Sequence, residues 1–337
     1  MRSAAQDGLT GLLLRSKALL RAPVAWVANW MLRLSGRRAG VVLVYHGVAD
    51  AQGDPRRDVV APHGKRLVEE QLRHVRARYR PVRAAELQAA AGARRRGQRF
   101  PVAVTFDDDL DSHAKVSAPL LRGLGLPATF FLCGASLHAP FRFWWERLQA
   151  AVDAGLALPP GAPELELPPA AGERPWTGAL HAVAMTIEAM PAAERDAIAA
   201  GLGERVGPDP PDAGMRAKLV RELVEAGFDV GFHTIRHDRM TALDDDALAR
   251  ALRNGRAELA SLAGCELDSF AYPHGKADAR VARAAGAAGF VSGFTTVPRA
   301  VGPDDDPLLQ GRHEPSYDSA GHLAVELVKL LRSVPAP

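Results

Sequence analysis

Short apolar runs alternate with amphipathic stretches along most of the chain. Runs rich in β-branched and aromatic residues occur at 40–48, 100–109, 127–134, 227–234, 268–275 and 289–296. Such runs are typical of strands buried on both faces of a parallel sheet. Helical patterns lie between them, at 69–79, 118–126, 215–228 and 244–264. Strands that alternate with helices predict βα units and an α/β fold with a parallel sheet or barrel.

The alternation stops between about residues 139 and 214. The segment contains the proline- and alanine-rich stretch LPPGAPELELPPAAGERPW, followed by an alanine-rich helical pattern. We interpret it as a helical insertion into the barrel or sheet, without a core of its own. The remaining boundaries are a basic segment at 1–38, a main domain at 39–317, and a C-terminal helix and tail at 318–337.

Composition excludes several classes of protein. Of 337 residues, 47% are hydrophobic and 24% charged, which is typical of a globular protein and not of a disordered or disulfide-rich chain. Cys133 and Cys265 lie far apart, so we expect neither a disulfide nor a cysteine-bound metal. The net charge is +3, but residues 1–40 carry seven Lys/Arg and one Asp, or +6, which leaves −3 for the rest. That distribution argues against nucleic acid as a partner.

Residues 9–34 combine apolar side chains, Trp26 and Trp30 with flanking cations. The longest uncharged run, 22–32, is shorter than the roughly 20 residues of a membrane span. Internal cations also argue against a cleaved export signal. We therefore expect a cytoplasmic protein in which this segment either contacts the inner membrane surface peripherally or packs on the protein's own core. Export through an uncleaved signal is a third alternative.

Polar side chains follow four of the predicted strands. They are His46, the run Asp107 to Asp109, His233, and the stretch Tyr272 to His274. The carboxyl ends of parallel strands are where α/β folds bind ligands. Polar residues at a single strand end are typical of a turn or a helix cap. Polar residues at four strand ends on one edge of the sheet predict a ligand-binding site.

His233 and His237 are four residues apart, so both imidazoles can bind one cation. This spacing alone is a weak signal, but the aspartate run supplies a third ligand. Two imidazoles and one carboxylate are typical of a catalytic zinc site with open positions. Of two consecutive aspartates, one can bind the cation while the other accepts a proton from water. We expect Asp109 and Asp111 to belong to a solvated helix start.

These motifs resemble the polysaccharide deacetylases, also known as the NodB homology domain or carbohydrate esterase family 4. TFDDD is similar to the first family motif and HTIRH to the second. The resemblance covers roughly residues 40 to 315 and implies a distorted (β/α) barrel of about seven strands. It implies that Asp107 is the catalytic base, and that Asp108, His233 and His237 bind a divalent metal, Zn²⁺ or else Co²⁺ or Ni²⁺.

FAYPHG resembles the third motif, which implies that Tyr272 and Pro273 line the substrate groove and that a backbone amide near His274 stabilises the oxyanion. The opening YHGV is similar to the branch that includes poly-N-acetylglucosamine deacetylases. That likeness makes His46 the first candidate for the general acid. His313 in LLQGRHEP is the second, because other family members have their acid histidine near this position. The sequence departs from the family pattern in three places: Asp109 replaces a glycine, the third motif lacks its arginine, and no DxxDW motif is present.

FRFWWERL, residues 141–148, places Trp144 and Trp145 where they either stack on sugar rings or pack the insertion onto the barrel. Adjacent helical residues point about 100° apart, so only one of the two is expected to reach substrate. The resemblance implies a metal-dependent hydrolase that removes N-acetyl groups from a polysaccharide, oligosaccharide or lipid-linked glycan. Two alternatives are an O-acetyl esterase and a non-catalytic carbohydrate-binding protein on the same fold. The sequence leaves the oligomeric state open.

Overall fold

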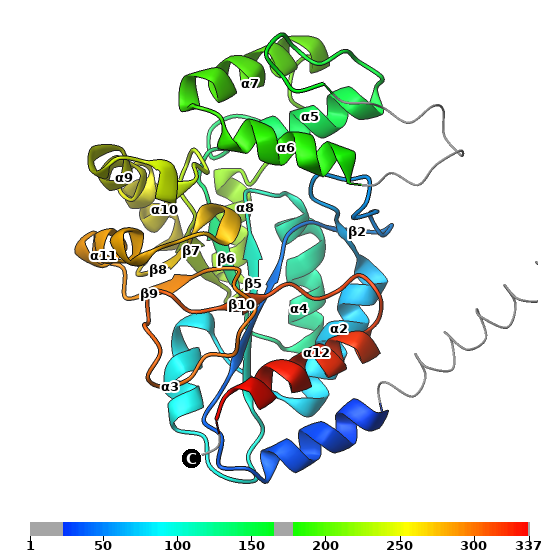
Figure 1. The fold of residues 1–337 in the computed structure, drawn as a ribbon, viewed down its shortest axis with the longest axis vertical. Coiled ribbons are helices and arrows are strands. Elements are labelled where there is room, and N and C mark those ends of the chain that lie inside the picture. Colours follow the sequence, from blue (N-terminus) through cyan, green and yellow to red (C-terminus); the bar gives the residue numbers. More distant parts are fainter. Residues whose placement is uncertain (1–22, 165–177, 336–337) are drawn as a thin grey trace, which may run out of the picture.

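Seven parallel strands form a nearly closed barrel at the centre of the molecule, with helices around it (Figure 1). The structure is a computed structural model that describes residues 23–164 and 178–335. The arrangement confirms the predicted distorted (β/α)₇ barrel. The barrel strands, in chain order, are β1 (Val41–Tyr45), β5 (Pro101–Asp107), β6 (Thr129–Leu132), β7 (Asp229–Phe232), β8 (Ser269–Ala271), β9 (Ser292–Phe294) and β10 (Arg312–His313).

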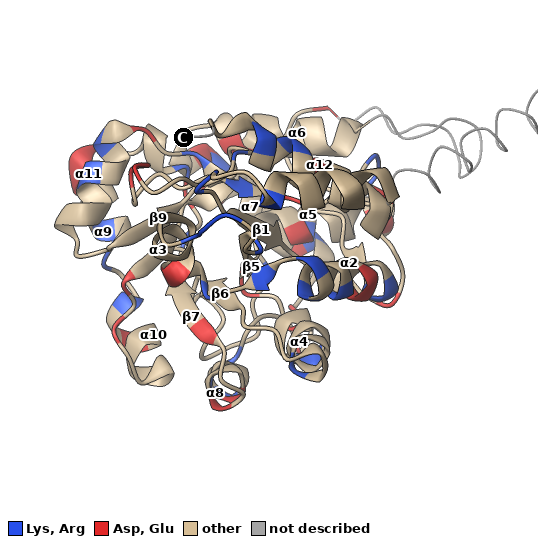
Figure 2. Ribbon diagram, turned by 90° about the horizontal axis from the view of Figure 1, so that it is seen from below, with Lys and Arg blue, Asp and Glu red and all other residues tan. Residues whose placement is uncertain are grey.

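The strands are ordered β10-β1-β5-β6-β7-β8-β9, and each pair is parallel. The last gap is bridged beside β10, where the Thr295 amide donates to the Gln310 carbonyl at 2.8 Å and the Gln310 amide donates to Gly293 at 2.9 Å. Figure 2 views the strands from below, around a common axis. Three short strands lie outside this path: β4 (Arg80–Pro81) pairs with β5, and β2 (Val48–Ala49) pairs with β3 (His63–Gly64).

Side chains alternate between the inside and the outside of the barrel, as the period of two in a strand requires. The inner cluster contains Val42, Ala103, Phe131, Ala271 and Phe294. Their neighbours along the strands belong to the outer cluster, under the helices: Leu43, Val104, Phe130, Phe270 and Tyr272. This parity decides which side chains at the strand ends can reach the barrel axis.

Helices cover the outside of the barrel. They are α2 (Lys65–Arg78), α3 (Leu87–Gly92), α4 (Ala118–Leu124), α8 (Ala217–Glu225), α9 (Asp245–Ala251), α10 (Arg256–Ala263), α11 (Ala279–Ala287) and α12 (Ala320–Ser333), with short helical turns η1 (Ala84–Glu86), η2 (His113–Ser117), η3 (Met240–Ala242) and η4 (Pro273–Gly275). The pattern at 244–264 forms two helices and not one. Gly255 between them has φ 79°, and a Cβ there would lie 2.2 Å from Ile235 Cδ1, so only glycine fits.

The insertion forms a layer of three helices above the carboxyl ends of the strands (Figure 1). These are α5 (Trp144–Asp153), α6 (Ala179–Ala189) and α7 (Ala192–Val206). They enclose a small hydrophobic cluster that includes Leu148, Leu180, Ile187 and Leu202. The expectation that this segment lacks a core of its own was therefore wrong, because its apolar residues face one another across the three helices.

Residues 23–33 form a helix that packs on α12, where Ala25 contacts the cluster of Ala324 and Val328. This N-terminal helix ends just before β1 and so lies at the amino end of the barrel. Residues 1–22, which hold most of the predicted basic segment, lie outside the described part. Within the part that the structure describes, no helix has both the length and the apolar character needed to cross a bilayer.

Candidate active site

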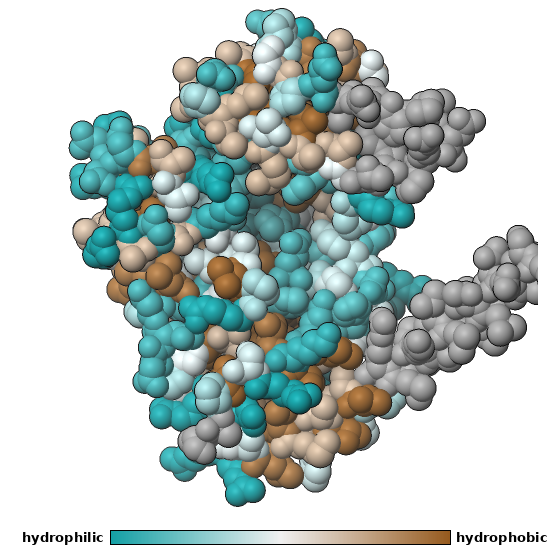
Figure 3. All heavy atoms as spheres, in the orientation of Figure 1, coloured by the Kyte–Doolittle hydropathy of each residue, from teal (hydrophilic) through white to brown (hydrophobic). Residues whose placement is uncertain are grey.

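A pocket lies at the carboxyl ends of the strands, between the barrel and the insertion. Figure 3 shows the molecule hollowed between these two parts. The barrel contributes His46, Asp107, Asp108, His233, His237 and His274 to its lining. At least one residue from each of the four predicted strand ends therefore lies at this pocket. Helix α6 contributes His181, Ala184, Met185 and Glu188, which recur at helical spacing and so share the face above the pocket.

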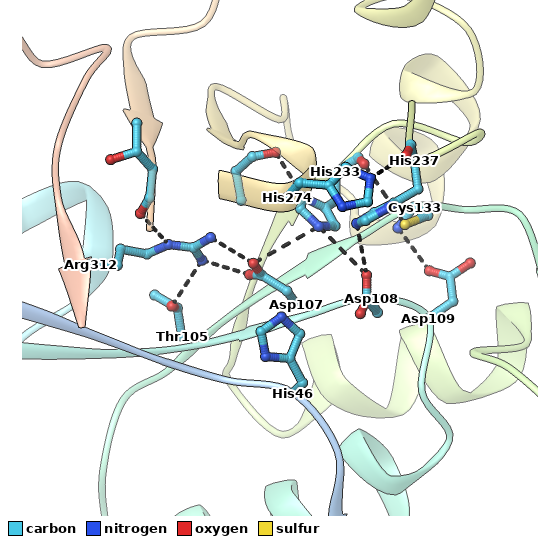
Figure 4. A network of polar contacts seen from close by, with 12 residues as sticks. His46, Thr105, Asp107, Asp108, Asp109, Cys133, His233, His237, His274 and Arg312 are labelled. Carbon is cyan, nitrogen blue, oxygen red and sulfur yellow. Dashed lines mark hydrogen bonds and ion pairs between the residues drawn. The ribbon is translucent and has the colours of Figure 1, made fainter. Parts of the chain in front are cut away.

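Asp108, His233 and His237 form a buried cluster (Figure 4). Asp108 Oδ1 lies 3.6 Å from His233 Nε2 and 3.4 Å from His237 Nε2. One ligand atom from each of the three residues lies within 4.8 Å of the others. Asp108 Oδ1 is buried and has no hydrogen-bond partner among the described residues. Two imidazole nitrogens and an unpaired carboxylate oxygen fit a divalent cation such as zinc.

Neighbouring groups orient both histidines. His233 donates from Nδ1 to the Ala271 carbonyl at 2.8 Å, which leaves the lone pair of Nε2 directed at the cluster. The His237 ring lies 4.7 Å from the ring of Trp145. Burial, followed by the nearby His274 and His233, lowers the pKa of His237 well below its ordinary value. A neutral imidazole is the form that binds a metal.

Asp107 points to the barrel axis and is paired with Arg312 (Figure 4). Arg312 Nη1 and Nη2 donate to the two carboxylate oxygens, each at 2.6 Å. Arg312 is fully buried, and its Nε donates to the Thr295 carbonyl at 3.1 Å. Burial alone would raise the pKa of Asp107, but the charges of Arg312 and His233 lower it to about 2. Asp107 is therefore a carboxylate at neutral pH, as a proton acceptor must be.

Arg312 is a site residue that the sequence did not reveal. The third motif lacks its usual arginine, and the guanidinium of Arg312 reaches Asp107 from β10. A second residue that was missed, His113, donates from Nε2 to the carbonyl of Asp107 at 2.8 Å and is fully buried. Both residues restrain Asp107, one at its side chain and one at its backbone.

Asp109 does not belong to a solvated helix start, and that prediction was wrong. Its carboxylate is buried and accepts four hydrogen bonds from the loop after β6. The donors are the amides of Cys133 at 2.8 Å, Gly134 at 3.1 Å and Ser136 at 3.1 Å, and the Ser136 hydroxyl at 3.0 Å. Asp111 is half-buried and pairs with Lys115 one helical turn later, at 2.6 Å.

Backbone strain is concentrated at the pocket. The non-glycine residues with positive φ in the described part of the chain are Asp108, Thr234, His237 and His274, with φ of 51–76°. Three of them line the pocket. Positive φ costs a non-glycine residue free energy, and such residues persist where the surroundings hold them for a function. The turn at Asp108 takes its side chain out of the strand direction and toward the two histidines.

His46 and His313 lie on different sides of the barrel wall. His46 has the same parity as Val42, lines the pocket, and has Nδ1 3.8 Å from Glu314 Oε1. Burial would lower the pKa of His46, but Glu314, Asp108 and Asp107 raise it to about 9. His313 follows the inward Arg312 and so points outward, where its Nε2 lies 3.1 Å from Glu326 Oε2. It does not line the pocket, whereas His46 does.

The third motif is arranged differently from the prediction. Tyr272 is fully buried among the outer cluster and donates to the Leu308 carbonyl at 2.8 Å, and Pro273 is also buried. Neither residue lines the pocket, because Tyr272 shares the outward parity of Phe270. His274 does line it. Its Nε2 lies 3.0 Å from Glu188 Oε2 on α6 and 3.2 Å from the His237 carbonyl.

Both tryptophans of α5 line the pocket. Trp145 is 7% exposed and is stacked on Phe143 with ring centroids 4.4 Å apart, so its main contacts are with the protein. Trp144 is half-buried and lies edge-on to Trp145. Trp145 thus packs the insertion against His237, and Trp144 is the more exposed of the two tryptophans.

The chain is similar to one family model and to several solved structures. The family model described as polysaccharide deacetylase matches residues 188–293, which include the second and third motifs. A comparison with curated protein sequences gave no match. The Streptococcus pyogenes deacetylase PplD in complex with acetate has a TM-score of 0.57 and 14% identity, over 86% of this chain and 98% of its own.

Two further solved structures are similar. IcaB from Ammonifex degensii has a TM-score of 0.55 and 19% identity, over 87% of this chain and 97% of its own. A de-N-acetylase from Aggregatibacter actinomycetemcomitans has a TM-score of 0.53 and 14% identity, over 83% and 96%. At such identities the likeness shows a shared fold. The polysaccharide deacetylase model thus covers residues 188–293 of this chain, and the solved structures share its fold, in keeping with the predicted resemblance.

Proposed function

We propose that this protein is a metal-dependent hydrolase that removes N-acetyl groups from an N-acetylated sugar and releases acetate. The substrate is a polysaccharide, an oligosaccharide or a lipid-linked glycan. The observation that carries the proposal is the position of Asp107, an ionised and buried carboxylate next to the cluster of Asp108, His233 and His237. A proton acceptor beside a cation site is the arrangement that amide hydrolysis requires.

A divalent cation bound at the cluster would polarise the acetyl carbonyl and lower the pKa of an attacking water. Asp107 accepts a proton from that water while the water oxygen bonds to the carbonyl carbon. His46 lies on the same inner face and, with a pKa of about 9, carries a proton at neutral pH. It donates that proton to the nitrogen as the C–N bond breaks, because an amine leaves poorly unless it is protonated. Acetate and a free amino sugar result.

The shape of the pocket supports a sugar as the substrate. Trp144 is a half-buried tryptophan in the pocket lining, and aromatic side chains carry the large apolar surface on which sugar rings stack. Helix α6 covers the opposite side, so the insertion completes a pocket that the barrel alone would leave open.

Acetate release from N-acetylglucosamine oligomers tests this function. We expect release that stops after chelation, returns with added Zn²⁺, Co²⁺ or Ni²⁺, and is lost in Asp108→Asn. Asp111→Asn is the matched control, since Asp111 lies in the same run but outside the pocket. A faster reaction with an O-acetylated sugar would favour the esterase. Binding of the oligomers without acetate release under any of these metals would favour a non-catalytic carbohydrate-binding protein.

A further inference from the structure

Large exposed apolar side chains are concentrated on one short segment. In the described part of the chain, eleven large hydrophobic residues are exposed, and six of them lie between residues 24 and 34. The six are Val24, Trp26, Val27, Trp30, Met31 and Leu34, each 42–66% exposed. Single exposed apolar residues are ordinary on protein surfaces, but a contiguous group of this kind marks an interaction site.

These side chains share one side of the N-terminal helix. At about 100° per residue, the five helical positions span less than half of the helix circumference, and Leu34 directly follows the last helical residue. The opposite side carries the buried Ala25 and Asn29 and contacts α12. The helix is therefore attached to the barrel by one face and presents a second apolar face outward. Figure 3 shows apolar side chains at the lower right of the molecule, over this helix and α12.

Arginines surround this apolar face. Arg33 donates to the Gly97 carbonyl at 3.1 Å, and Arg96 donates to the Leu34 carbonyl at 2.5 Å, so the loop of residues 94–99 is joined to the end of the helix. Arg95 and Arg99 are exposed on that loop. The guanidinium of Arg78 lies 4.5 Å above the Trp26 ring. Neither residues 23–49 nor residues 87–106 contain an acidic residue.

We propose that this docking face, formed by the six apolar residues and the arginines Arg33, Arg78, Arg95, Arg96 and Arg99, binds the surface of a bilayer that contains anionic lipid. Tryptophan and aliphatic side chains enter the interface between headgroups and acyl chains, and the arginines contact anionic headgroups. Figure 2, viewed from this end, shows basic segments on α2 and before β1.

Charge favours an anionic bilayer over two other occupants of the docking face, a second copy of this chain and residues 1–22. A second copy of the same face would bring two sets of arginines together, and like charges disfavour that contact. Residues 1–22 contain four Lys/Arg and one Asp, a net charge of 4 − 1 = +3, so they too are cationic. An anionic lipid surface complements both the apolar face and its basic border.

The docking face and the pocket lie at opposite ends of the barrel. The helix precedes the first residue of β1, whereas the pocket lies where the strands end, under the insertion (Figure 1). With the docking face on a bilayer, the pocket opens away from the lipid. The glycan that reaches it would extend into the aqueous phase, and not lie among the headgroups.

Co-sedimentation of the full-length chain with vesicles tests this inference. One set contains equal parts phosphatidylcholine and phosphatidylglycerol, and the other contains phosphatidylcholine alone. We expect binding to the anionic vesicles that weakens as salt is added. The variant Val27→Ser/Trp30→Ser/Met31→Ser should bind at least about tenfold more weakly, because it removes the apolar insertion. Arg95→Gln/Arg99→Gln should reduce binding to anionic vesicles and lower its salt dependence.

Val291→Ser/Val297→Ser is the matched control, since both valines are exposed, at 60% and 53%, and lie outside the docking face. All variants should keep the unfolding midpoint of the parent. Vesicle binding that the triple variant does not weaken would overturn the inference, as would the absence of binding to both vesicle types. Concentration-dependent dimerisation that the triple variant abolishes would assign the face to a second copy.

Discussion

The guanidinium of Arg312 holds the carboxylate of Asp107 through two hydrogen bonds of 2.6 Å, inside the barrel, where both side chains are almost fully buried. The pair joins the predicted base on β5 to the short strand β10, more than two hundred residues later. Since both groups are buried and charged, each depends on the other for its stability in the folded protein.

Arg312→Met should therefore destabilise the protein by about 3–5 kcal/mol, because it leaves the Asp107 charge buried without a counter-charge. Urea unfolding measures this. The double variant Asp107→Asn/Arg312→Met removes the orphaned charge and should recover part of the loss. A double variant as unstable as the two single changes combined would mean that the pair has no energetic coupling.

Glu314→Gln should move the alkaline limb of the kcat/KM profile to lower pH. Glu314 is the first of the groups that raise the pKa of His46 to about 9, and His46 acts when protonated. Without that carboxylate the pKa of His46 falls, so the acid is lost at a lower pH, by about one unit. Glu326→Gln is the matched control, because Glu326 pairs with the outward His313. A shift in the control and none in Glu314→Gln would make His313 the acid.

Glu188→Gln should lower kcat/KM by about tenfold while the unfolding midpoint changes little. Glu188 is the carboxylate that α6 places against His274, and a neutral amide holds that imidazole less firmly. His274→Ala should cause a similar loss, and the double variant should lose little more, since the two residues act as one unit. Glu194→Gln, on the exposed first turn of α7, should have no effect. Fully additive losses would show that Glu188 does not act through His274.

Asp109→Ala should cost about 3 kcal/mol of stability, because two buried amides, one half-buried amide and one hydroxyl would lose their acceptor. Asp111→Ala, which removes a partly solvated ion pair, should change the free energy of unfolding by less than about 1 kcal/mol. Equal effects of the two substitutions in urea unfolding would contradict the structural role of Asp109.

The sequence was sufficient for the barrel and for the residues directly after its long strands. The apolar runs located six of the seven barrel strands, and side-chain parity places His46, Asp107 and His233 on the inner face. The same parity could have corrected two assignments. Tyr272 is two residues from Phe270 on an outward face, and His313 follows an inward arginine, so neither can reach the pocket.

Other parts of the site could not be predicted from local patterns. Arg312 lies in a strand of two residues, and Glu314 directly follows that strand. A strand this short gives no periodic signal in the sequence. Glu188 lies in a helical segment whose position over the barrel is set by long-range packing. Asp109 looked like a helix cap because its four donors lie more than twenty residues later. In each case the partner across the fold, and not the neighbouring sequence, determines the role.

Metal content of the purified full-length protein, measured by elemental analysis, tests the central claim most directly. The account predicts about one zinc, cobalt or nickel ion per chain in the parent protein and in Asp111→Asn. It predicts loss of the ion in Asp108→Asn and in His237→Ala, with the folded state retained by circular dichroism. Metal that stays bound in both of these variants, or a metal-free parent that still releases acetate, would contradict the assignment of Asp108, His233 and His237.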